Sequence, residues 1–280
     1  MRTGLTHVFR RKPGVNRSVA EKVWKLCRDG KKKSPTAGDA PGFVQANLVV
    51  VPKKYAFDFL KFCLMNPKPC PVLDVTEPGS KTFRNIAPNA DVSTDLPLYR
   101  VWRHGVLEKE VTDVQDLYGD DMVAFALGCS FSWEDVLAEN KLIPRHVEMS
   151  CNVPMYRTNI SNKISGPFGG HLVVSMRPYT LQDVKKVTGI TSCYPGAHGG
   201  PIHVGDPKSI GIKDLNCPDF GDKIKIRDDE IPVFWACGVT PQSAIEAAKI
   251  PLAITHSPGH MLICDVLNSE LRVSESETSS

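Results

Sequence analysis

Apolar and polar positions recur with two different periods along this chain, which predicts a mixture of helices and strands. Residues 18–29 carry apolar side chains at helical spacing. Ser18 and Glu21 are placed as in a capping box, and Gly30 follows as a helix end. Residues 48–51 form a continuous branched apolar run, which is typical of a strand buried on both faces.

The same two periods predict further elements, separated by loops rich in glycine and proline. Helical spacing predicts helices over 55–64, 114–127, 133–142, 181–187 and 241–249. Short apolar runs predict strands over 72–73, 98–102, 171–176, 233–235, 252–255 and 261–264. Because strand and helix alternate so often, we expect an α/β architecture with a second α+β unit in the irregular middle of the chain.

Composition excludes some classes of protein but does not distinguish one class of enzyme from another. A chain of 280 residues with 41% hydrophobic and 23% charged residues is ordinary for a globular protein of one large domain or two small ones. The net charge is +3, and the basic excess lies before Ser34. The mildly acidic remainder argues against a nucleic-acid partner, and no apolar run reaches the length of a membrane span.

Cysteine usage indicates free thiols rather than a metal or redox centre. The nine cysteines are scattered and none forms a CxxC pair, so zinc-ribbon and thioredoxin readings lack support. We expect most of these thiols to be buried in a protein of a reducing compartment.

The two ends of the chain are expected to lie outside the folded unit of residues 17–267. Residues 1–16 are rich in arginine and hold no acidic residue, which resembles a mitochondrial presequence and predicts the mitochondrial matrix. The alternative is a disordered basic arm on a cytosolic protein. Residues 268–280 read as a disordered polar tail.

Three loops rich in glycine and proline, at 198–207, 234–242 and 254–261, carry the candidate chemistry. Each follows or joins a predicted strand, and ligands of open α/β sheets gather at the carboxyl ends of strands. We therefore predict that His203, Cys237 and His260 face one pocket, with Asp206 at its edge.

Each of these side chains also has a structural reading. Histidine serves as acid, base or metal ligand, and His203, His256 and His260 with an aspartate would make a zinc or iron set. The expectation here is that no metal is bound. Cys237 is either a nucleophile activated by a helix end or a small buried hydrophobe.

Several common motifs are absent from the sequence. There is no GxxxxGK[ST], GxGxxG, HExxH or GxSxG. Their absence argues against phosphate activation by ATP, hydride transfer from a dinucleotide, zincin hydrolysis and α/β-hydrolase chemistry. No cofactor is implied.

Long stretches distributed over residues 17–267 resemble the D-glutamate cyclase family, whose microbial members carry the name hydro-lyase. These stretches are 46–48, 66–71, 94–97, 127–132, 152–158, 173–178, 198–207, 218–222, 232–242 and 254–261. The resemblance implies a three-layer α/β/α unit joined to a smaller two-layer α+β unit, which we place within about 95–190. Ser93 departs from the microbial pattern, where an arginine stands.

The resemblance further implies a carbon–oxygen lyase that cyclises D-glutamate to 5-oxo-D-proline with loss of water. Such a reaction needs an acid–base pair, an oxyanion site and a cation for the α-carboxylate. The expected acids, bases and nucleophile are His198, His203, Asp206, Cys237 and His260. The expected substrate-binding residues are Arg157, Arg177, Gly199, Gly200, Gly238 and His256.

Two other functions stay open at this point. One is a non-catalytic lobe that binds a small acid, because longer animal members carry a further C-terminal domain that this chain lacks. The other is a metal-dependent hydratase of a different acid. In every case the expected partner is a small molecule, and self-association into a homo-oligomer stays open.

Overall fold

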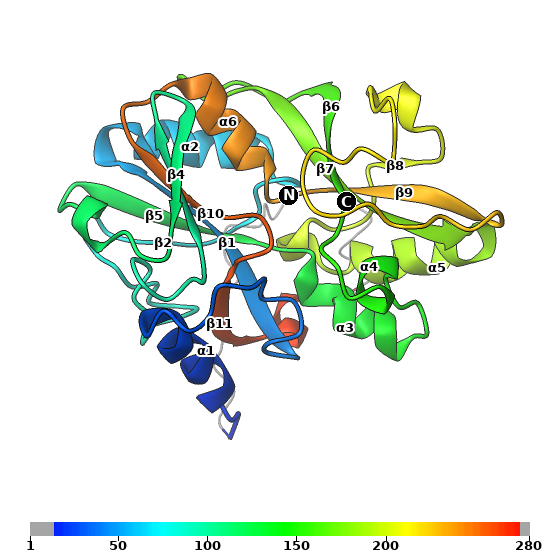
Figure 1. Ribbon diagram of the computed structural model, residues 1–280, viewed down its shortest axis with the longest axis horizontal. Coiled ribbons are helices and arrows are strands. Elements are labelled where there is room, and N and C mark those ends of the chain that lie inside the picture. The colour runs from blue at the N-terminus through cyan, green and yellow to red at the C-terminus, as the bar shows by residue number, and fades with distance from the viewer. Residues whose placement is uncertain (1–13, 275–280) are drawn as a thin grey trace.

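The computed structural model describes residues 14–274 as two antiparallel sheets lying side by side (Figure 1). The larger sheet has the strand order β2-β5-β1-β10-β3-β4, with β11 also paired to β1. The smaller sheet has the order β6-β7-β9-β8. All four strands of the smaller sheet lie between β5 and β10 in the sequence, so the smaller sheet is an insertion in the larger one.

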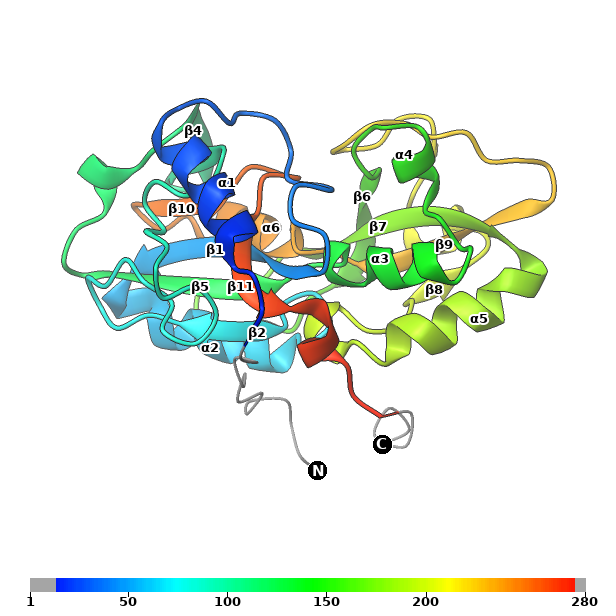
Figure 2. The ribbon, with the colours of Figure 1, turned by 90° about the horizontal axis from the view of Figure 1, so that it is seen from below.

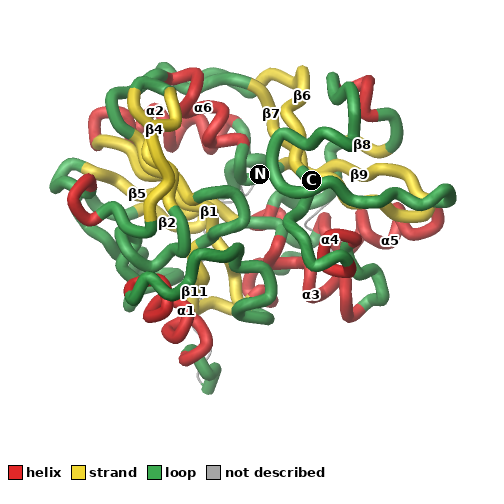
Figure 3. The backbone as a smooth tube through the Cα atoms, in the orientation of Figure 1, coloured by secondary structure: helices red, strands yellow, loops and turns green. Residues whose placement is uncertain are grey.

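The strands are bounded as follows. The larger sheet comprises β1 (Phe43–Pro52), β2 (Val72–Val75), β3 (Tyr99–Arg103), β4 (Val106–Val111), β5 (Met122–Gly128), β10 (Ala253–His256) and β11 (Leu262–Leu267). The smaller sheet comprises β6 (Met155–Ser161), β7 (His171–Thr180), β8 (His203–Val204) and β9 (Glu230–Ala236). Much of the chain between β8 and β9 is loop (Figure 3).

The α-helices are α1 (Ser18–Arg28), α2 (Lys53–Met65), α3 (Phe131–Glu139), α4 (Arg145–Glu148), α5 (Leu181–Ser192) and α6 (Thr240–Ala248). Short 3-10 turns are η1 (Gln115–Leu117), η2 (Pro195–Ala197), η3 (Pro207–Ile210) and η4 (Asn268–Leu271). Among the described residues, no helix is both long and apolar enough to cross a membrane.

Strand β1 shows why the larger sheet needs helices on both faces. Val44, Leu48 and Val50 point into a core shared with α1, whereas Val49 and Val51 point into a core shared with α2 and α6. The branched run therefore buries both faces, as its composition predicts. The two views show α1 on one side of this sheet and α2 on the other (Figures 1 and 2).

The two faces of the smaller sheet are covered differently. Val233 and Trp235 pack with Val187 of α5, while Phe234 faces a cluster that includes Ile210 of η3 and Ile224 of the following loop. The expected α/β class is confirmed, with a helix-covered larger unit and a smaller helix-and-sheet unit.

Several predicted elements need correction. The helix predicted over 114–127 is instead η1 followed by β5, because residues 122–128 are buried on both faces in the middle of the larger sheet. Helix α1 begins at Ser18, but its N-cap is Arg17 rather than Ser18, and the side chain of Asn16 accepts the amide of Ser18 at 3.1 Å. Thr180 does cap α5, accepting the amide of Asp183.

The expected limits of the smaller unit also differ from the structure. The smaller sheet takes its strands from 155–236 rather than from 95–190, because β3, β4 and β5 pair into the larger sheet. Order extends beyond residue 267, since Leu271 of η4 is fully buried. Most of the predicted arm and the last part of the predicted tail lie outside the described residues.

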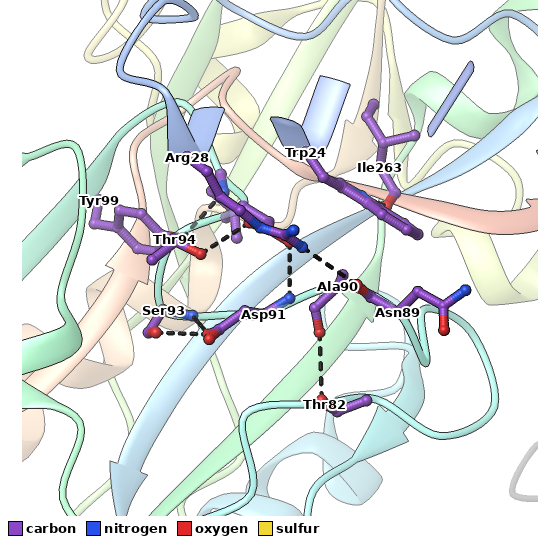
Figure 4. A network of polar contacts seen from close by, with 12 residues as sticks. Trp24, Arg28, Thr82, Asn89, Ala90, Asp91, Ser93, Thr94, Tyr99 and Ile263 are labelled. Atoms are coloured by element: carbon purple, nitrogen blue, oxygen red, sulfur yellow. Dashed lines mark hydrogen bonds and ion pairs between the residues drawn. The ribbon is translucent and has the colours of Figure 1, made fainter. Parts of the chain in front are cut away.

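Helix α1 is fixed to the larger sheet by a closed polar network (Figure 4). Arg28 donates from Nε to Oδ1 of Asp95 at 2.6 Å and from Nη2 to Oδ2 at 2.5 Å. The amide of Asp91 and the hydroxyl of Thr94 also donate to Asp95. Trp24 donates its indole N–H to the carbonyl of Ile263 on β11.

Candidate active site

A buried arginine–glutamate pair joins the two units of the fold. Strand β7 of the smaller sheet carries Arg177, and α3, which follows β5 of the larger sheet, carries Glu134. Arg177 donates from Nη2 and Nε to Oε1 of Glu134 at 2.5 and 3.1 Å. Its remaining bonds go to Ser130 and Ser175, and its guanidinium lies 4.6 Å from the ring centre of Trp133.

His146 of α4 completes this cluster from the other side of Glu134. Its Nε2 lies 3.2 Å from Oε1 and 3.3 Å from Oε2 of Glu134, and its ring stacks on Phe131. A carboxylate acceptor at Nε2 requires a proton on that nitrogen. The other ring nitrogen, Nδ1, is buried and has no hydrogen-bond partner among the described residues. His146 is 1% exposed, so this atom is an unsatisfied group that calls for a partner.

The electrostatics keep Glu134 ionised. Burial alone would raise the pKa of its carboxyl group, but the charges and hydrogen bonds of His146 and Arg177 outweigh burial and lower that pKa to about 2. Glu134 is therefore a carboxylate at neutral pH, and it orients the imidazole of His146 as the aspartate of a catalytic triad orients its histidine.

A cavity of about 520 Å³ lies against the same cluster. Glu134, His146 and Phe131 line it from α3 and α4, while the loop 35–43 lines the opposite side. Asp135, Asn152 and Asp222 are among its other polar lining residues. With more carboxylates than cations, the lining favours the cationic end of a ligand.

The sequence comparisons decide the family. The D-glutamate cyclase family model matches residues 123–265. A protein of Bordetella petrii is 54% identical over 247 residues, which cover 88% of this chain and 94% of the relative. The chain belongs to the D-glutamate cyclase family. A Staphylococcus haemolyticus protein is 53% identical over 254 residues, covering 91% of this chain and 97% of its own length. A Geobacillus kaustophilus protein is 54% identical over 248 residues, covering 89% and 94%.

Each of these three relatives bears the name "putative hydro-lyase". The resemblance to the cyclase family predicted from the sequence is thus confirmed, and the relatives' names point to an enzyme of the hydro-lyase class. Phe131, Asn152 and Asp222, which line the cavity, come from stretches that carry the family resemblance.

The structure places the predicted residue Arg177 in the cluster itself, and two others, His198 and Cys237, within reach of its charge. Arg177 itself is the centre of the cluster, but it binds a carboxylate of its own chain. The charge of Arg177 acts on both His198 and Cys237. Burial raises the pKa of the Cys237 thiol to about 11, although the amides of Val239 and Gly238 and the charge of Arg177 oppose this rise. Cys237 is therefore a protonated thiol at neutral pH.

The loop of His198 is occupied with structural bonds. Nδ1 of His198 lies 2.7 Å from the carbonyl of Lys68, and burial lowers the pKa of the imidazole to about 4. The amide of Gly199 donates to the carbonyl of Tyr194, so it is not available to an oxyanion. A Cβ on Gly200 would come within 2.4 Å of Ser192, and one on Gly238 would collide with Asn47. These glycines allow segments to pack closely.

His203 and Asp206 lie on the outer face of the smaller sheet. His203 packs its ring on Phe234 and bonds through Nε2 to the carbonyl of Asp206 and the hydroxyl of Ser209. The carboxylate of Asp206 accepts the amide of Lys208 and so begins η3. The hydrogen-bond partners of His203 thus belong to its own loop, and its ring contact is with β9.

The remaining predicted residues hold other parts of the fold together. Nδ1 of His256 lies 3.2 Å from the amide of Leu48, which ties β10 to β1, and burial lowers the pKa of His256 to about 4. His260 contacts the carbonyls of Pro258 and Lys33. Arg157 forms a two-bond ion pair with Glu246 of α6. Cys237 and Met261, the neighbour of His260, belong to one apolar cluster, and the single pocket for His203, Cys237 and His260 stays a prediction.

The sequence reasoning missed Glu134 and His146. An acid in the first turn of a helix most often serves the helix dipole, so Glu134 gives no functional signal in the sequence. His146 lies in the four-residue helix α4, too short to produce a periodic signal. In the described part of the chain, no group of three or more His, Cys, Asp and Glu side chains is placed to hold a metal ion.

Proposed function

We propose that this protein is a hydro-lyase that cyclises D-glutamate to 5-oxo-D-proline, with His146 as the acid–base residue. The family supports the reaction class, and one observation supports the site. His146 lines a cavity and is oriented by an ionised carboxylate, and its Nδ1 has no hydrogen-bond partner among the described residues. Buried polar groups in native structures are normally satisfied, so this atom is the place for a substrate proton.

The proposed reaction forms a nitrogen–carbon bond and breaks a carbon–oxygen bond. The α-ammonium group gives a proton to Nδ1 of His146, and the amine attacks the γ-carboxyl carbon. As the lactam forms, nitrogen loses a second proton and the γ-carboxyl oxygen departs as water. Two protons leave nitrogen and both finish on that oxygen, so His146 carries them in turn and ends unchanged.

The other residues of the cluster would position the acid–base group. Glu134 holds Nε2 of His146, and Arg177 holds Glu134 in its ionised form. Asp135 and Asp222 give the cavity its negative character, which suits the ammonium group of the substrate. A cavity of about 520 Å³ has room for a molecule as small as glutamate.

The deciding experiment is to incubate the purified chain with D-glutamate and to follow the product by mass spectrometry and chiral chromatography. We expect loss of one water and a lactam of unchanged configuration, with L-glutamate as the control substrate. Binding of D-glutamate without turnover would instead assign a small-acid binding lobe. Turnover that stops on chelation and returns with added metal would assign a metal-dependent hydratase.

Targeting to the mitochondrial matrix belongs with this proposal as a separate expectation. It depends on residues 1–16, most of which lie outside the described part of the chain, and the relatives compared above are bacterial. Fusing residues 1–16 to a fluorescent protein tests it in cells. A mitochondrial signal would support a presequence, whereas a diffuse cytosolic signal would leave the basic-arm reading.

A further inference from the structure

A second cavity, of about 610 Å³, lies between α3, α5 and the C-terminal turn η4. Asp135 lines both this cavity and the one beside His146, so α3 separates the two. None of the stretches that carry the family resemblance, and none of the predicted site residues, lines the second cavity. Its chemistry therefore needs its own account.

A helical glycine opens this cavity. Gly189 lies inside α5, where glycine is less favourable than alanine because it loses more backbone entropy on folding. A Cβ built on Gly189 would meet no atom within 4 Å, so close packing of the protein does not require glycine here. Gly189 lines the cavity, and because it has no side chain it leaves room there for a ligand.

A buried amide at the cavity wall is only half satisfied. Asn268 is 5% exposed, and its Nδ2 lies 3.4 Å from Oδ2 of Asp135. Its side-chain oxygen is buried and has no hydrogen-bond partner among the described residues. Such an oxygen needs a donor, because leaving it unpaired costs free energy. The donor would come from a ligand placed beside Asp135.

The charges of the lining are divided between two elements. Asp135 and Glu139 supply carboxylates from α3, and Arg272 supplies a guanidinium from the segment after η4. Tyr194, which also lines the cavity, is close enough to Arg272 for that charge to act on its hydroxyl group. A carboxylate with an amide acceptor on one side, and a guanidinium with a phenol on the other, match the two ends of a zwitterion.

We propose that this cavity is a second binding site for a free α-amino acid. The ammonium group of the ligand binds Asp135 and the side-chain oxygen of Asn268, and its carboxylate binds Arg272. The α-carbon passes over Gly189, where a side chain would obstruct it. The site is distinct from His146 but shares α3 with it through Asp135.

The test follows the backbone amide of Gly189 by NMR while D-glutamate, L-glutamate or glutarate is added to the whole chain. We expect both glutamates to shift this resonance saturably, and glutarate, which lacks the ammonium group, to bind at least tenfold more weakly. Arg272→Gln should weaken binding of the glutamates about tenfold, as expected for loss of a charge-assisted contact. If neither enantiomer shifts the Gly189 amide in the wild-type protein, the proposal is wrong.

Two further variants separate this site from the proposed active site. Gly189→Leu should abolish the binding seen at α5, and Gly189→Ala should weaken it while raising the melting temperature, because alanine favours the helix. His146→Ala should leave the shift of the Gly189 amide unchanged even though lactam formation is lost. If the Gly189→Leu variant still bound amino acids at α5 with wild-type affinity, the proposed second site would be wrong, whatever the outcome of the turnover assay.

Discussion

Two arginine–carboxylate pairs, Arg28–Asp95 and Arg177–Glu134, use the same chemical groups in different settings. In the first, both oxygens of Asp95 are buried and occupied, since Arg28, Asp91 and Thr94 all donate to them. In the second, Glu134 is shared between Arg177 and His146, and Nδ1 of His146 has no partner within residues 14–274.

The difference teaches how a structural ion pair can be told from one that supports chemistry. The Arg28 network is closed and its task is to fix α1 on the sheet, as Figure 4 shows. The Arg177 cluster is incomplete at one atom, and that atom belongs to a residue that lines a cavity. Both pairs have a buried carboxylate and short donor–acceptor distances, so neither property identifies a functional site. An unsatisfied polar group beside a cavity identifies one.

The largest effect should follow from removing the incomplete member. His146→Ala should reduce the turnover of D-glutamate by about 10²–10⁴-fold, the range typical of a lost acid–base residue. The measurement is kcat by the lactam assay, with circular dichroism to check that the fold is kept. His203→Ala is the matched control, since His203 contacts its own loop and should leave kcat within about twofold. Equal losses in the two variants would contradict the assignment.

Removing the buried arginine should cost the most stability. Arg177→Met leaves Glu134 as a buried carboxylate with His146 as its remaining partner. Breaking a buried pair on one side typically costs about 3–5 kcal/mol of unfolding free energy. Urea denaturation measures this change. The double variant Arg177→Met with Glu134→Leu removes both charges and should recover part of the loss, whereas a further equal loss would show that the pair is not coupled.

Acid should destabilise the fold through His198 and His256 before it acts through Glu134. His198 and His256 have folded pKa values of about 4 against 6.5 in a model peptide, so the unfolded chain binds more protons between these pH values. Their contribution to stability is complete above pH 6.5 and is lost as pH falls to 4, at up to about 1.4 kcal/mol per pH unit for each proton. The contribution of Glu134, whose pKa is lowered from 4.5 to about 2, is lost only below pH 4.5.

Urea denaturation at a series of pH values measures this dependence. His256→Asn should lower the slope between pH 6.5 and 4 by up to one proton. A slope that stays the same in His256→Asn would mean that this imidazole does not titrate on unfolding.

The smallest effect is expected from the closed network. Asp95→Asn keeps the shape of the side chain but removes the charge that Arg28 and the Asp91 amide bind. We expect a loss of about 1–3 kcal/mol of unfolding free energy, as for a buried group left with imperfect partners. Because α1 lies away from His146, kcat should not change. A fall in kcat comparable to that of His146→Ala would remove the distinction between the two pairs.

Local patterns predicted most of the fold and little of the site. The run at 48–51 is a strand whose apolar residues face cores on both sides. The run at 261–264 is buried as well, with Leu262, Ile263 and Cys264 in one core and Met261 in another. Residues 122–128 were assigned to a helix because a short apolar run fits both periods, and pairing with β1 and β2 decided the outcome. Edge strand β4 was missed because its residues are mostly exposed.

The site depends on contacts that the order of residues does not contain. Glycine and proline correctly predicted loops at His198, Cys237 and His260. The same residue types also allow segments to pack closely, and that is their role in these loops. Arg177 was expected to bind a carboxylate and does so, although the carboxylate is Glu134. His146 and Glu134 come together only through the packing of α4 against α3 beside β7, which no spacing rule describes.

Strand β1 has a consequence for how the chain is made by the ribosome. One edge of β1 pairs with β5, and the other is completed by β11 over its first residues and by β10 over its last ones. Those two strands are translated last, and α1, translated first, also waits for the carbonyl of Ile263 on β11. The smaller sheet, by contrast, is fully synthesised once β9 has emerged. We therefore expect the nascent chain to carry a finished smaller sheet and an open β1 edge until β10 and β11 have emerged, so closure of the larger sheet depends on these two strands.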